Sequence, residues 1–494
     1  MKLELIGHDE RYAVEQNLLA FFPEERPVYG VITPEDSDWA RVTLKEKETV
    51  CTVCTQIVCG GKTASAAQSG ALCGTDYEKE GKRRRLIGRS FFAAARSVTG
   101  RTPAWGSLTG IRPAKIAARL LETGQSPEQA QETLGETYSV SPPRSRLAVE
   151  AAEAGLAARR DLSPRDVAVY IGIPFCPTRC AYCSFVSSSV EKSLAMVEPY
   201  VGALEDEVRA GGQMLRDLGL RVRAFYMGGG TPTTLSAAQM DRLLTTFKKS
   251  FDLSACREYT VEAGRPDTIT PEKLYVLQKH GVTRLSINPQ TMEDSVLRAI
   301  GRRHTADDIR RAMAQAQAAG FTHINMDLIA GLPEDTPEGF RRSLDECLSF
   351  GCDNLTVHTL SLKRGSAILT QGLSIPAADA VGEMLDYADP ALRNAGYRPY
   401  YLYRQKYMSG SFENVGWCLP GGENLYNIYI MEELCSILSL GAGGSTKMVD
   451  PAGNHIVRAF NLKYPKEYTE RPEKWKSNQA EFAAFYRTPG EGRR

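Results

Sequence analysis

Apolar, β-branched runs alternate with helical patterns between residues 164 and 370, and this alternation constrains the fold more than any other feature. The six runs are Val167 to Ile173, Ala224 to Met227, Tyr259 to Glu262, Arg284 to Asn288, His323 to Ile329 and Asn354 to Leu362. The helical patterns between them fall at about 190–216, 236–249, 271–280, 292–300, 305–319 and 336–350. Strands that alternate with helices of this length are typical of parallel βαβ units. The pattern therefore predicts an α/β fold, a partial (βα)6 TIM-like barrel, with its chemistry at the carboxyl ends of the strands.

The residues before this region predict a separate α+β domain. Residues 40–46 alternate as a strand does, and 49–58 are rich in β-branched residues. Helical patterns follow at 113–122 and 145–159, and loop signals at 161–164 place a boundary near residue 163.

The residues after the barrel predict a C-terminal extension with less regular structure. We expect a helix over 427–439 and a loosely packed helix or a tail over the last thirty residues. The predicted domains are an N-terminal α+β domain, a barrel and an extension, at 1–163, 164–370 and 371–494.

Charge and hydropathy exclude several function classes. The chain has 60 Lys and Arg against 59 Asp and Glu, a net charge of +1, which gives no attraction to nucleic acid or anionic membrane. No apolar run is long enough to span a bilayer, and residues 1–10 lack a secretion-signal pattern. We therefore expect a cytoplasmic protein, in which the 12 cysteines serve as thiols, metal ligands or catalysts rather than disulfides.

Three cysteines occur within eight residues directly after the first barrel strand: Cys176, Cys180 and Cys183. Zinc sites usually bring two Cys-x2-Cys pairs or a pair with histidines, whereas the spacing here is x3 then x2. Three thiolates on one loop can hold three irons of a cubane cluster and leave the fourth iron open. Unrelated thiols or a truncated zinc knuckle is the alternative interpretation.

This motif resembles the signature of the radical S-adenosylmethionine (SAM) superfamily, Cys-x3-Cys-x2-Cys after the first strand of a partial barrel. The resemblance implies a [4Fe-4S] cluster held by the three cysteines, with SAM on the open iron. It also implies that SAM is cleaved to a 5′-deoxyadenosyl radical that abstracts hydrogen.

Glycines and polar residues at the ends of the later strands are similar to the SAM-binding positions of that superfamily. The Gly228-Gly-Gly-Thr231 turn after the second strand is expected to allow close backbone approach and to offer free amides to the methionine end of SAM. The other residues would supply acceptors for ribose hydroxyls and a charge partner for a carboxylate. The expected SAM-binding residues are Tyr170, Tyr182, Gly229, Gly230, Thr231, Glu262, Gln290, Arg302, Asp327 and Ser361.

Four longer segments resemble the oxygen-independent coproporphyrinogen III oxidase family: 170–176, 228–233, 284–290 and 327–333. Segments 106–113, 401–408 and 413–417 are similar to its coproporphyrinogen dehydrogenase-like branch, which carries an extra N-terminal domain. The resemblance implies oxidative decarboxylation of coproporphyrinogen III to protoporphyrinogen IX in haem biosynthesis. It implies a tetrapyrrole substrate and an electron donor such as flavodoxin or ferredoxin. The oligomeric state does not follow from it.

Two positions depart from the family pattern and leave alternatives open. Phe185 stands where the characterised oxidases have a fourth cysteine, and Gly172 stands where they have histidine. A haem-carrying branch also has phenylalanine at the first position, but its His-Asn and Tyr-Trp pairs are absent from the nearest segment, 422–427. A haem-binding chaperone, or a radical SAM enzyme acting on another substrate such as tRNA, therefore remains an alternative.

Other residue groups have weaker functional interpretations. Cys51 and Cys54 would lie on opposite faces of a strand, which favours structural thiols over a metal site that includes Cys59 and Cys73. The basic stretch from Lys82 to Arg101 is expected to be a solvated face rather than an anion site. For His304 and His358 two interpretations stay open: each is either a packed or capping residue, or a haem ligand or proton donor.

Overall fold

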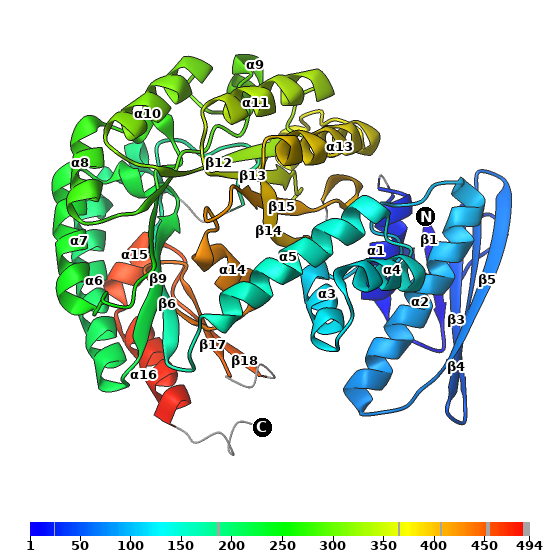
Figure 1. Cartoon of the computed structure of the whole chain (residues 1–494). Helices are drawn as coiled ribbons and strands as arrows, with labels where there is room; N and C mark the ends of the chain where they lie inside the picture. Colours follow the sequence, from blue (N-terminus) through cyan, green and yellow to red (C-terminus); the bar gives the residue numbers. More distant parts are fainter. Residues whose placement is uncertain (24, 185–187, 364–365, 406–407, 451–454, 488–494) are drawn as a thin grey trace. The chain divides into compact units, whose positions relative to one another are not determined.

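The computed structural model describes residues 1–23, 25–184, 188–363, 366–405, 408–450 and 455–487 (Figure 1). The chain forms two compact units. The first contains residues 1–152 and 402–413, and the second contains 153–401 and 414–494. The three-domain division stays a prediction. In the structure most of the predicted extension belongs to the barrel unit, and only its short segment 402–413 belongs to the N-terminal unit.

The N-terminal unit is built on a five-stranded sheet of order β2-β1-β3-β4-β5. Its strands are β1 (Lys2–Ile6), β2 (Val28–Tyr29), β3 (Trp39–Lys47), β4 (Val50–Cys59) and β5 (Lys62–Ala71). Its helices are α1 (Arg11–Phe21), α2 (Asp76–Thr99), α3 (Pro113–Glu122), α4 (Pro127–Tyr138) and α5 (Pro142–Arg160). The strands expected at 40–46 and 49–58 are β3 and β4, and the helices expected at 113–122 and 145–159 are α3 and α5.

One face of this sheet packs on α1 and α2. Val42 and Val53 of the sheet and Leu18 and Phe91 of the helices are fully or almost fully buried in one core. Along β4 the side chains alternate, so that Cys51 is buried.

Cys54, three residues further along β4, is exposed, because residues an odd number apart on a strand lie on opposite faces, as the sequence predicted. The basic stretch 82–101 lies largely on α2, where Arg83 pairs with Glu46 and Arg84 pairs with Glu10 and Glu80.

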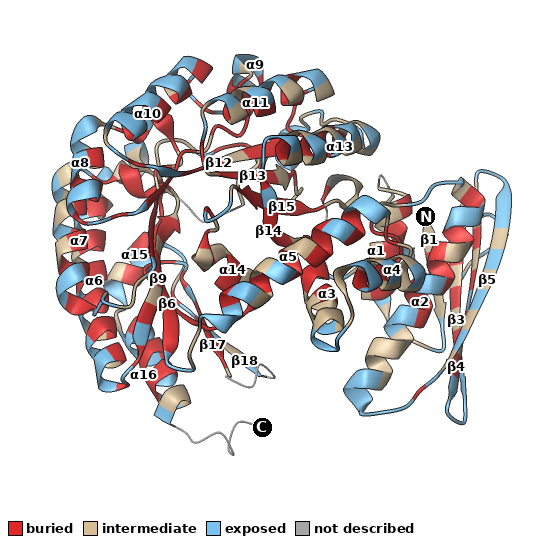
Figure 2. Ribbon diagram, viewed as in Figure 1, coloured by how far each residue is buried: buried red, intermediate tan, exposed pale blue. Residues whose placement is uncertain are grey.

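The second unit contains six parallel strands that form the predicted partial barrel. They are β6 (Asp166–Ile173), β9 (Arg221–Gly229), β10 (Glu258–Glu262), β11 (Arg284–Ser286), β12 (His323–Ala330) and β13 (Asn354–Thr359). The helices that follow them are α6 (Val190–Asp217), α7 (Ala237–Ser250), α8 (Pro271–Lys279), α9 (Asp294–Ala299), α10 (Ala306–Ala318) and α11 (Pro337–Ser349). Figure 2 shows buried strands inside and helices with exposed outer faces. The predicted α/β fold with a partial (βα)6 barrel is confirmed.

Both edges of this sheet are extended by the C-terminal part of the chain. Strands β14 (Arg398–Tyr403) and β15 (Asn414–Cys418) follow β13 at one edge, and β15 is antiparallel to β13. At the other edge β16 (Ser436–Leu440) runs parallel to β6, followed by β17 (Ser445–Val449) and β18 (Ile456–Phe460). The strand order β14-β15-β13-β12-β11-β10-β9-β6-β16-β17-β18 makes a sheet of 11 strands.

The helix expected over 427–439 is wrong in its second half. Helix α14 (Leu425–Glu432) ends at Glu433, which has a φ of 56° in the left-handed region. Residues 436–440 then form β16, because all five are buried beside β6. A short apolar run does not distinguish a buried strand from a buried helix segment, so its partner decides.

The last part of the chain is helical, as expected, but it is not loosely packed. Helix α15 (Pro465–Glu470) and helix α16 (Glu473–Arg487) place Tyr468, Trp475 and Phe482 in the interior. The other α-helices of the described residues are α12 (Ala367–Gln371) and α13 (Ala378–Asn394). Within the described ranges, no helix has the length and apolar character needed to cross a membrane.

Candidate active site

The three motif cysteines lie on one loop beyond the carboxyl end of β6. Cys180 is buried, and Cys176 and Cys183 are half-buried. The loop is anchored where the amide of Ala181 donates to the carbonyl of Ile300 at 2.9 Å. Among the described residues, no three Cys, His, Asp or Glu side chains are gathered closely enough to hold a metal ion. Phe185, which follows this loop, lies outside the described residues.

Hydrogen-bond donors face two of these thiols. The hydroxyl of Thr231 lies 3.6 Å from Sγ of Cys176, and Nη1 of Arg265 lies 3.7 Å from Sγ of Cys180. Donors in this position can hydrogen-bond to a ligand sulfur, and the thiolate is the form of cysteine that binds iron. The loop therefore fits a thiolate-bound iron–sulfur cluster in its donor set.

The glycine turn after β9 packs directly against the start of the cysteine loop. The amides of Gly230 and Thr231 donate to the carbonyls of Ile173 and Phe175, each at 2.7 Å. A Cβ at Gly230 would lie 2.5 Å from the Phe175 oxygen, and Gly229 adopts a φ of 113°. The expectation that these amides are free is therefore wrong for Gly230 and Thr231, because the turn uses them to hold two backbones together.

Gly172 occupies a similarly narrow place on β6. Its carbonyl accepts a hydrogen bond of 2.6 Å from the hydroxyl of Tyr200, and a Cβ at this position would lie 3.2 Å from the carbonyl oxygen of Ala442. A larger residue would push on this backbone. The departure from histidine at this position therefore has a local structural reason.

Glu262, at the end of β10, is held by a tyrosine from the neighbouring strand. The hydroxyl of Tyr226 donates to Oε1 of Glu262 at 2.6 Å. Burial is the largest influence on this carboxyl and raises its pKa to about 7, although hydrogen bonds from Tyr226 and the Gly229 amide oppose the shift. The carboxyl can therefore change its protonation state near neutral pH.

Three tyrosine rings stack beside this carboxyl. The Tyr226 ring lies 6.2 Å from that of Tyr170 and 4.6 Å from that of Tyr426, measured between centroids, with the planes nearly parallel. Tyr170 comes from β6, whereas Tyr426 comes from α14 in the C-terminal part of the chain. The stack forms an aromatic wall next to Glu262.

Asp327 of β12 lies in a polar cluster between neighbouring strands. Nδ2 of Asn325 donates to Oδ1 of Asp327 at 2.8 Å, and Nε2 of His358 lies 3.8 Å from Oδ2. Burial alone would favour the neutral acid, but His358, Asn325 and Thr356 outweigh it and hold the pKa of Asp327 below its usual value. Asp327 is therefore an ionised acceptor at neutral pH.

Gln290 and Arg302 are fixed by their surroundings. Gln290 is buried with a φ of 70°, and its backbone bonds with Asp327 and Ile329 of β12. A non-glycine residue in this region is uncommon and often marks a functional site.

The buried guanidinium of Arg302 donates to the Asn288 carbonyl and to the Tyr182 hydroxyl, at 2.5 and 3.1 Å. Its Nε is buried and has no acceptor among the described residues. Ser361 lies two residues past β13 and is half-buried.

Segment 422–426 is bound inside the barrel at the amino ends of the strands. The carboxylate of Glu258 accepts from the amides of Leu425 and Tyr426, at 2.7 and 3.1 Å. Arg284 and Asn354 both donate to the carbonyl of Gly422, each at 2.9 Å. Glu258, Arg284 and Asn354 are the first residues of β10, β11 and β13. The segment that they bind therefore forms the floor of the site.

Sequence reasoning missed Arg265, Tyr226 and Tyr426. Arg265 follows Glu262 by three residues, so its place just past a strand end was a usable signal. Tyr426 had no local signal, because its role depends on a contact with residues about two hundred positions earlier in the chain.

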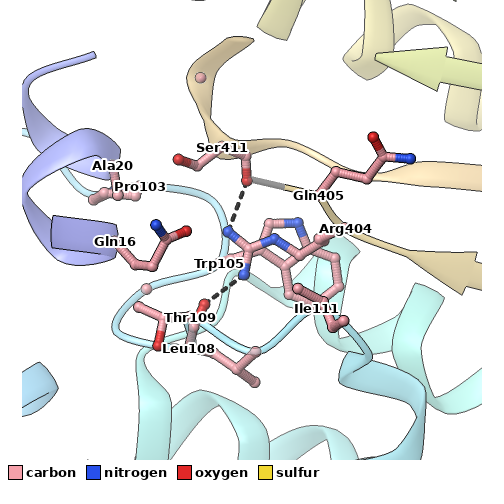
Figure 3. Close-up of a pocket in the computed structure, with 12 residues that line it drawn as sticks. Gln16, Ala20, Pro103, Trp105, Leu108, Thr109, Ile111, Arg404, Gln405 and Ser411 are labelled. Atoms are coloured by element: carbon pink, nitrogen blue, oxygen red, sulfur yellow. Dashed lines mark hydrogen bonds between the residues drawn. The ribbon is translucent and has the colours of Figure 1, made fainter. Parts of the chain in front are cut away.

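The N-terminal unit contains a small cavity that shares no residue with this site. It is lined by Trp105, Leu108, Arg404 and Ser411 among others (Figure 3). The Arg404 guanidinium lines it and donates to the carbonyls of Leu108 and Ser411. Its volume of about 10 Å³ would hold a single water molecule, so it is no substrate pocket.

Comparison with known proteins agrees with this geometry. The radical SAM superfamily model matches residues 170–347. The chain is 38% identical to the oxygen-independent coproporphyrinogen-III oxidase-like protein HemZ of Bacillus subtilis, over 98% of this chain and 97% of that protein. The chain belongs to this oxidase-like family of radical SAM proteins. Members of the superfamily use a [4Fe-4S] cluster and SAM.

Two further relatives cover less of this chain. The heme chaperone HemW of Mycobacterium tuberculosis is 29% identical over 61% of this chain and 73% of its own length. The solved structure of coproporphyrinogen III oxidase (HemN) from Escherichia coli shares the fold, with a TM-score of 0.52 and 23% identity over 65% of this chain and 72% of that chain. Both likenesses are consistent with the barrel described above.

Proposed function

We propose that Cys176, Cys180 and Cys183 hold a [4Fe-4S] cluster and that SAM binds beside it. The position of the loop at the carboxyl end of β6 and the donors that face Cys176 and Cys180 support this assignment. Parallel barrels collect their chemistry at that end. When bound, the cluster and SAM supply a 5′-deoxyadenosyl radical.

Most residues expected at SAM have a role that their contacts allow, and Ser361, which lies two residues past β13, is proposed together with them. Arg302 offers a free N–H to the carboxylate of SAM. Glu262 and Asp327 accept from its amino or ribose groups, and Gln290 is held by the backbone of β12 for the same purpose. Tyr170 and Tyr182 lie beside these groups, whereas Gly229, Gly230 and Thr231 set the distance between the turn and the cysteine loop.

We assign oxidative decarboxylation of coproporphyrinogen III to this site. Each of two propionate side chains loses a hydrogen atom, carbon dioxide and one electron, and a vinyl group remains, which yields protoporphyrinogen IX. The electron passes to an acceptor outside the chain. The barrel supplies positioning and exclusion of water, because the stack of Tyr170, Tyr226 and Tyr426 and the floor segment close the interior.

The single observation that carries this assignment is the likeness to the oxidase-like HemZ, which extends over 98% of this chain. This likeness includes the N-terminal unit. The match to HemW spans 61% of the chain, which is too short to cover both the N-terminal unit and the barrel unit. We further propose a cytoplasmic location and a flavodoxin or ferredoxin as electron donor.

The second candidate is a haem chaperone, which the 29% identity to HemW favours. In the haem-carrying branch a His-Asn pair corresponds to segment 422–427. Here Asn424 is buried and donates to Thr260, and Tyr426 stacks on Tyr226. These side chains serve the barrel floor, which argues against haem ligation at this segment.

Anaerobic reconstitution with iron and sulfide separates the two candidates. We expect SAM cleavage that increases when coproporphyrinogen III is added, together with a decarboxylated product. Stable haem binding without tetrapyrrole turnover would overturn the oxidase assignment in favour of the chaperone.

A further inference from the structure

Arg265 connects the end of β10 to the cysteine loop through a buried network. Its side chain is 3% exposed, and its Nε and Nη2 form a forked pair with Oδ1 and Oδ2 of Asp267, at 3.2 and 3.3 Å. The other N–H groups point to the loop, where Nη2 reaches the hydroxyl of Thr178 at 3.1 Å and Nη1 lies 3.7 Å from Sγ of Cys180. The fork thus fixes the orientation of the guanidinium toward one thiol.

The charge of Arg265 is paired with one carboxylate, that of Asp267, which lies against its Nε and Nη2, whereas the Cys180 thiol lies against its Nη1. Asp267 is ionised, because His304 and Arg265 outweigh the effect of burial and lower its pKa to about 2. His304 lies 3.6 Å from Asp267, and burial lowers the pKa of His304, which keeps the imidazole neutral. Asp267 is therefore the one anion that the described residues place against this guanidinium, and the thiol of Cys180 faces its other side.

We propose that Arg265 is a positioning residue that orients the Cys180 loop and raises the reduction potential of the bound cluster. The proposal rests on the proposed function, since it requires that Cys180 ligates the cluster. Reduction adds one negative charge to the cluster, and a buried cation with an N–H directed at a ligand sulfur stabilises that charge. A lysine cannot form the same fork, because its ammonium is a single point of charge.

A substitution of Asp267 tests the proposal in the opposite direction from a substitution of Arg265. Its carboxylate neutralises part of the charge of Arg265, so its removal should leave the guanidinium more effective toward the cluster. Arg265→Met should therefore lower the potential and Asp267→Asn should raise it. General loosening of the loop would move both potentials in the same direction.

The experiment is an anaerobic redox titration of the reconstituted full chain, followed by electron paramagnetic resonance without substrate. For Arg265→Met we expect the ratio of reduced to oxidised cluster at a fixed potential to fall about tenfold, which is about 59 mV for a one-electron couple. Arg265→Lys should recover part of this change, and Asp267→Asn should shift the ratio the other way. Arg303→Gln is the matched control, because Arg303 is exposed and pairs with Glu191 instead of a cysteine.

Two outcomes would overturn the inference while leaving the proposed function standing. One is a potential in Arg265→Met equal to that of the wild-type chain, and the other is a shift of the same sign in Asp267→Asn. A wild-type chain that assembles no cluster would instead overturn the proposed function, and the inference with it.

Discussion

The hydroxyl of Tyr226 donates a hydrogen bond of 2.6 Å to Glu262, which joins the second and third barrel strands at their carboxyl ends. This bond stabilises the ionised form of a carboxyl whose pKa burial raises to about 7. The proposed SAM site therefore contains an acceptor whose charge depends on pH in the physiological range.

Tyr226→Phe should shift the pH at which SAM binds. Removal of the donor raises the pKa of Glu262 further, so the ionised acceptor forms only at higher pH. We expect SAM affinity to fall about tenfold at pH 7 and to recover toward pH 8.5, in line with about 1.4 kcal/mol per pKa unit. Equilibrium dialysis of labelled SAM between about pH 7 and 8.5 measures this affinity. Affinity profiles with the same pH dependence for Tyr226→Phe and the wild-type chain would contradict the expectation.

Glu207 should make the stability of the barrel unit depend on pH. Its carboxylate accepts from the Gly441 amide, the Tyr468 hydroxyl and the Asn461 amide, but burial raises its pKa to about 7. The folded chain keeps the Glu207 carboxyl protonated at pH values at which the unfolded chain has already released that proton. The contribution of this carboxyl to the free energy of unfolding is therefore complete at low pH. It is lost as pH rises toward 7.

Glu207→Gln removes this proton-linked contribution. Between pH 5 and 7 the free energy of unfolding of the wild-type chain should fall more steeply than that of the variant, by about 1.4 kcal/mol per pH unit. Urea unfolding at several pH values provides the two slopes. Equal slopes would show that Glu207 titrates normally.

Gly230→Ala should displace the cysteine loop. The added Cβ would lie 2.5 Å from the backbone oxygen of Phe175, which has no flexible end to yield. We expect the reconstituted variant to bind less than half of the wild-type iron, by analogy with overpacking costs of about 1–3 kcal/mol. Gly202→Ala is the control, since no atom lies within 4 Å of its added Cβ. Full iron content in Gly230→Ala would refute the close-approach role.

Glu413→Gln should destabilise the N-terminal unit. Glu413 is buried, forms an ion pair of 3.0 Å with Arg144 and accepts a hydrogen bond of 2.6 Å from the indole of Trp105. Loss of its charge removes this anion from the buried Arg144, at a cost of about 3–5 kcal/mol in the free energy of unfolding. Glu150→Gln is the matched control, because its partner Arg146 is exposed. A similar small effect in both variants would contradict this expectation.

The barrel and its strand ends could be predicted from the sequence because their signals are local. Six β-branched runs with helices between them fix the parallel units, and the end of each strand fixes the neighbourhood of Glu262 and Asp327. The cysteine spacing likewise lies within one loop. Periodicity and spacing both act over a few residues, which a single sequence contains.

The features that the sequence did not reveal depend on contacts between distant segments. Residues 436–440 are a strand because β6 lies beside them, and Tyr426 belongs to the site because its ring meets Tyr226. The amides of Gly230 and Thr231 were expected to be free, yet the adjacent loop occupies them. Such outcomes are set by packing partners, which local pattern does not specify.

The most direct measurement is the formation of 5′-deoxyadenosine by the anaerobically reconstituted chain, with and without coproporphyrinogen III. The account predicts that the porphyrinogen stimulates SAM cleavage, that vinyl product and carbon dioxide accumulate, and that Cys180→Ala abolishes all three. SAM cleavage that is indifferent to coproporphyrinogen III, with no vinyl product, would contradict it.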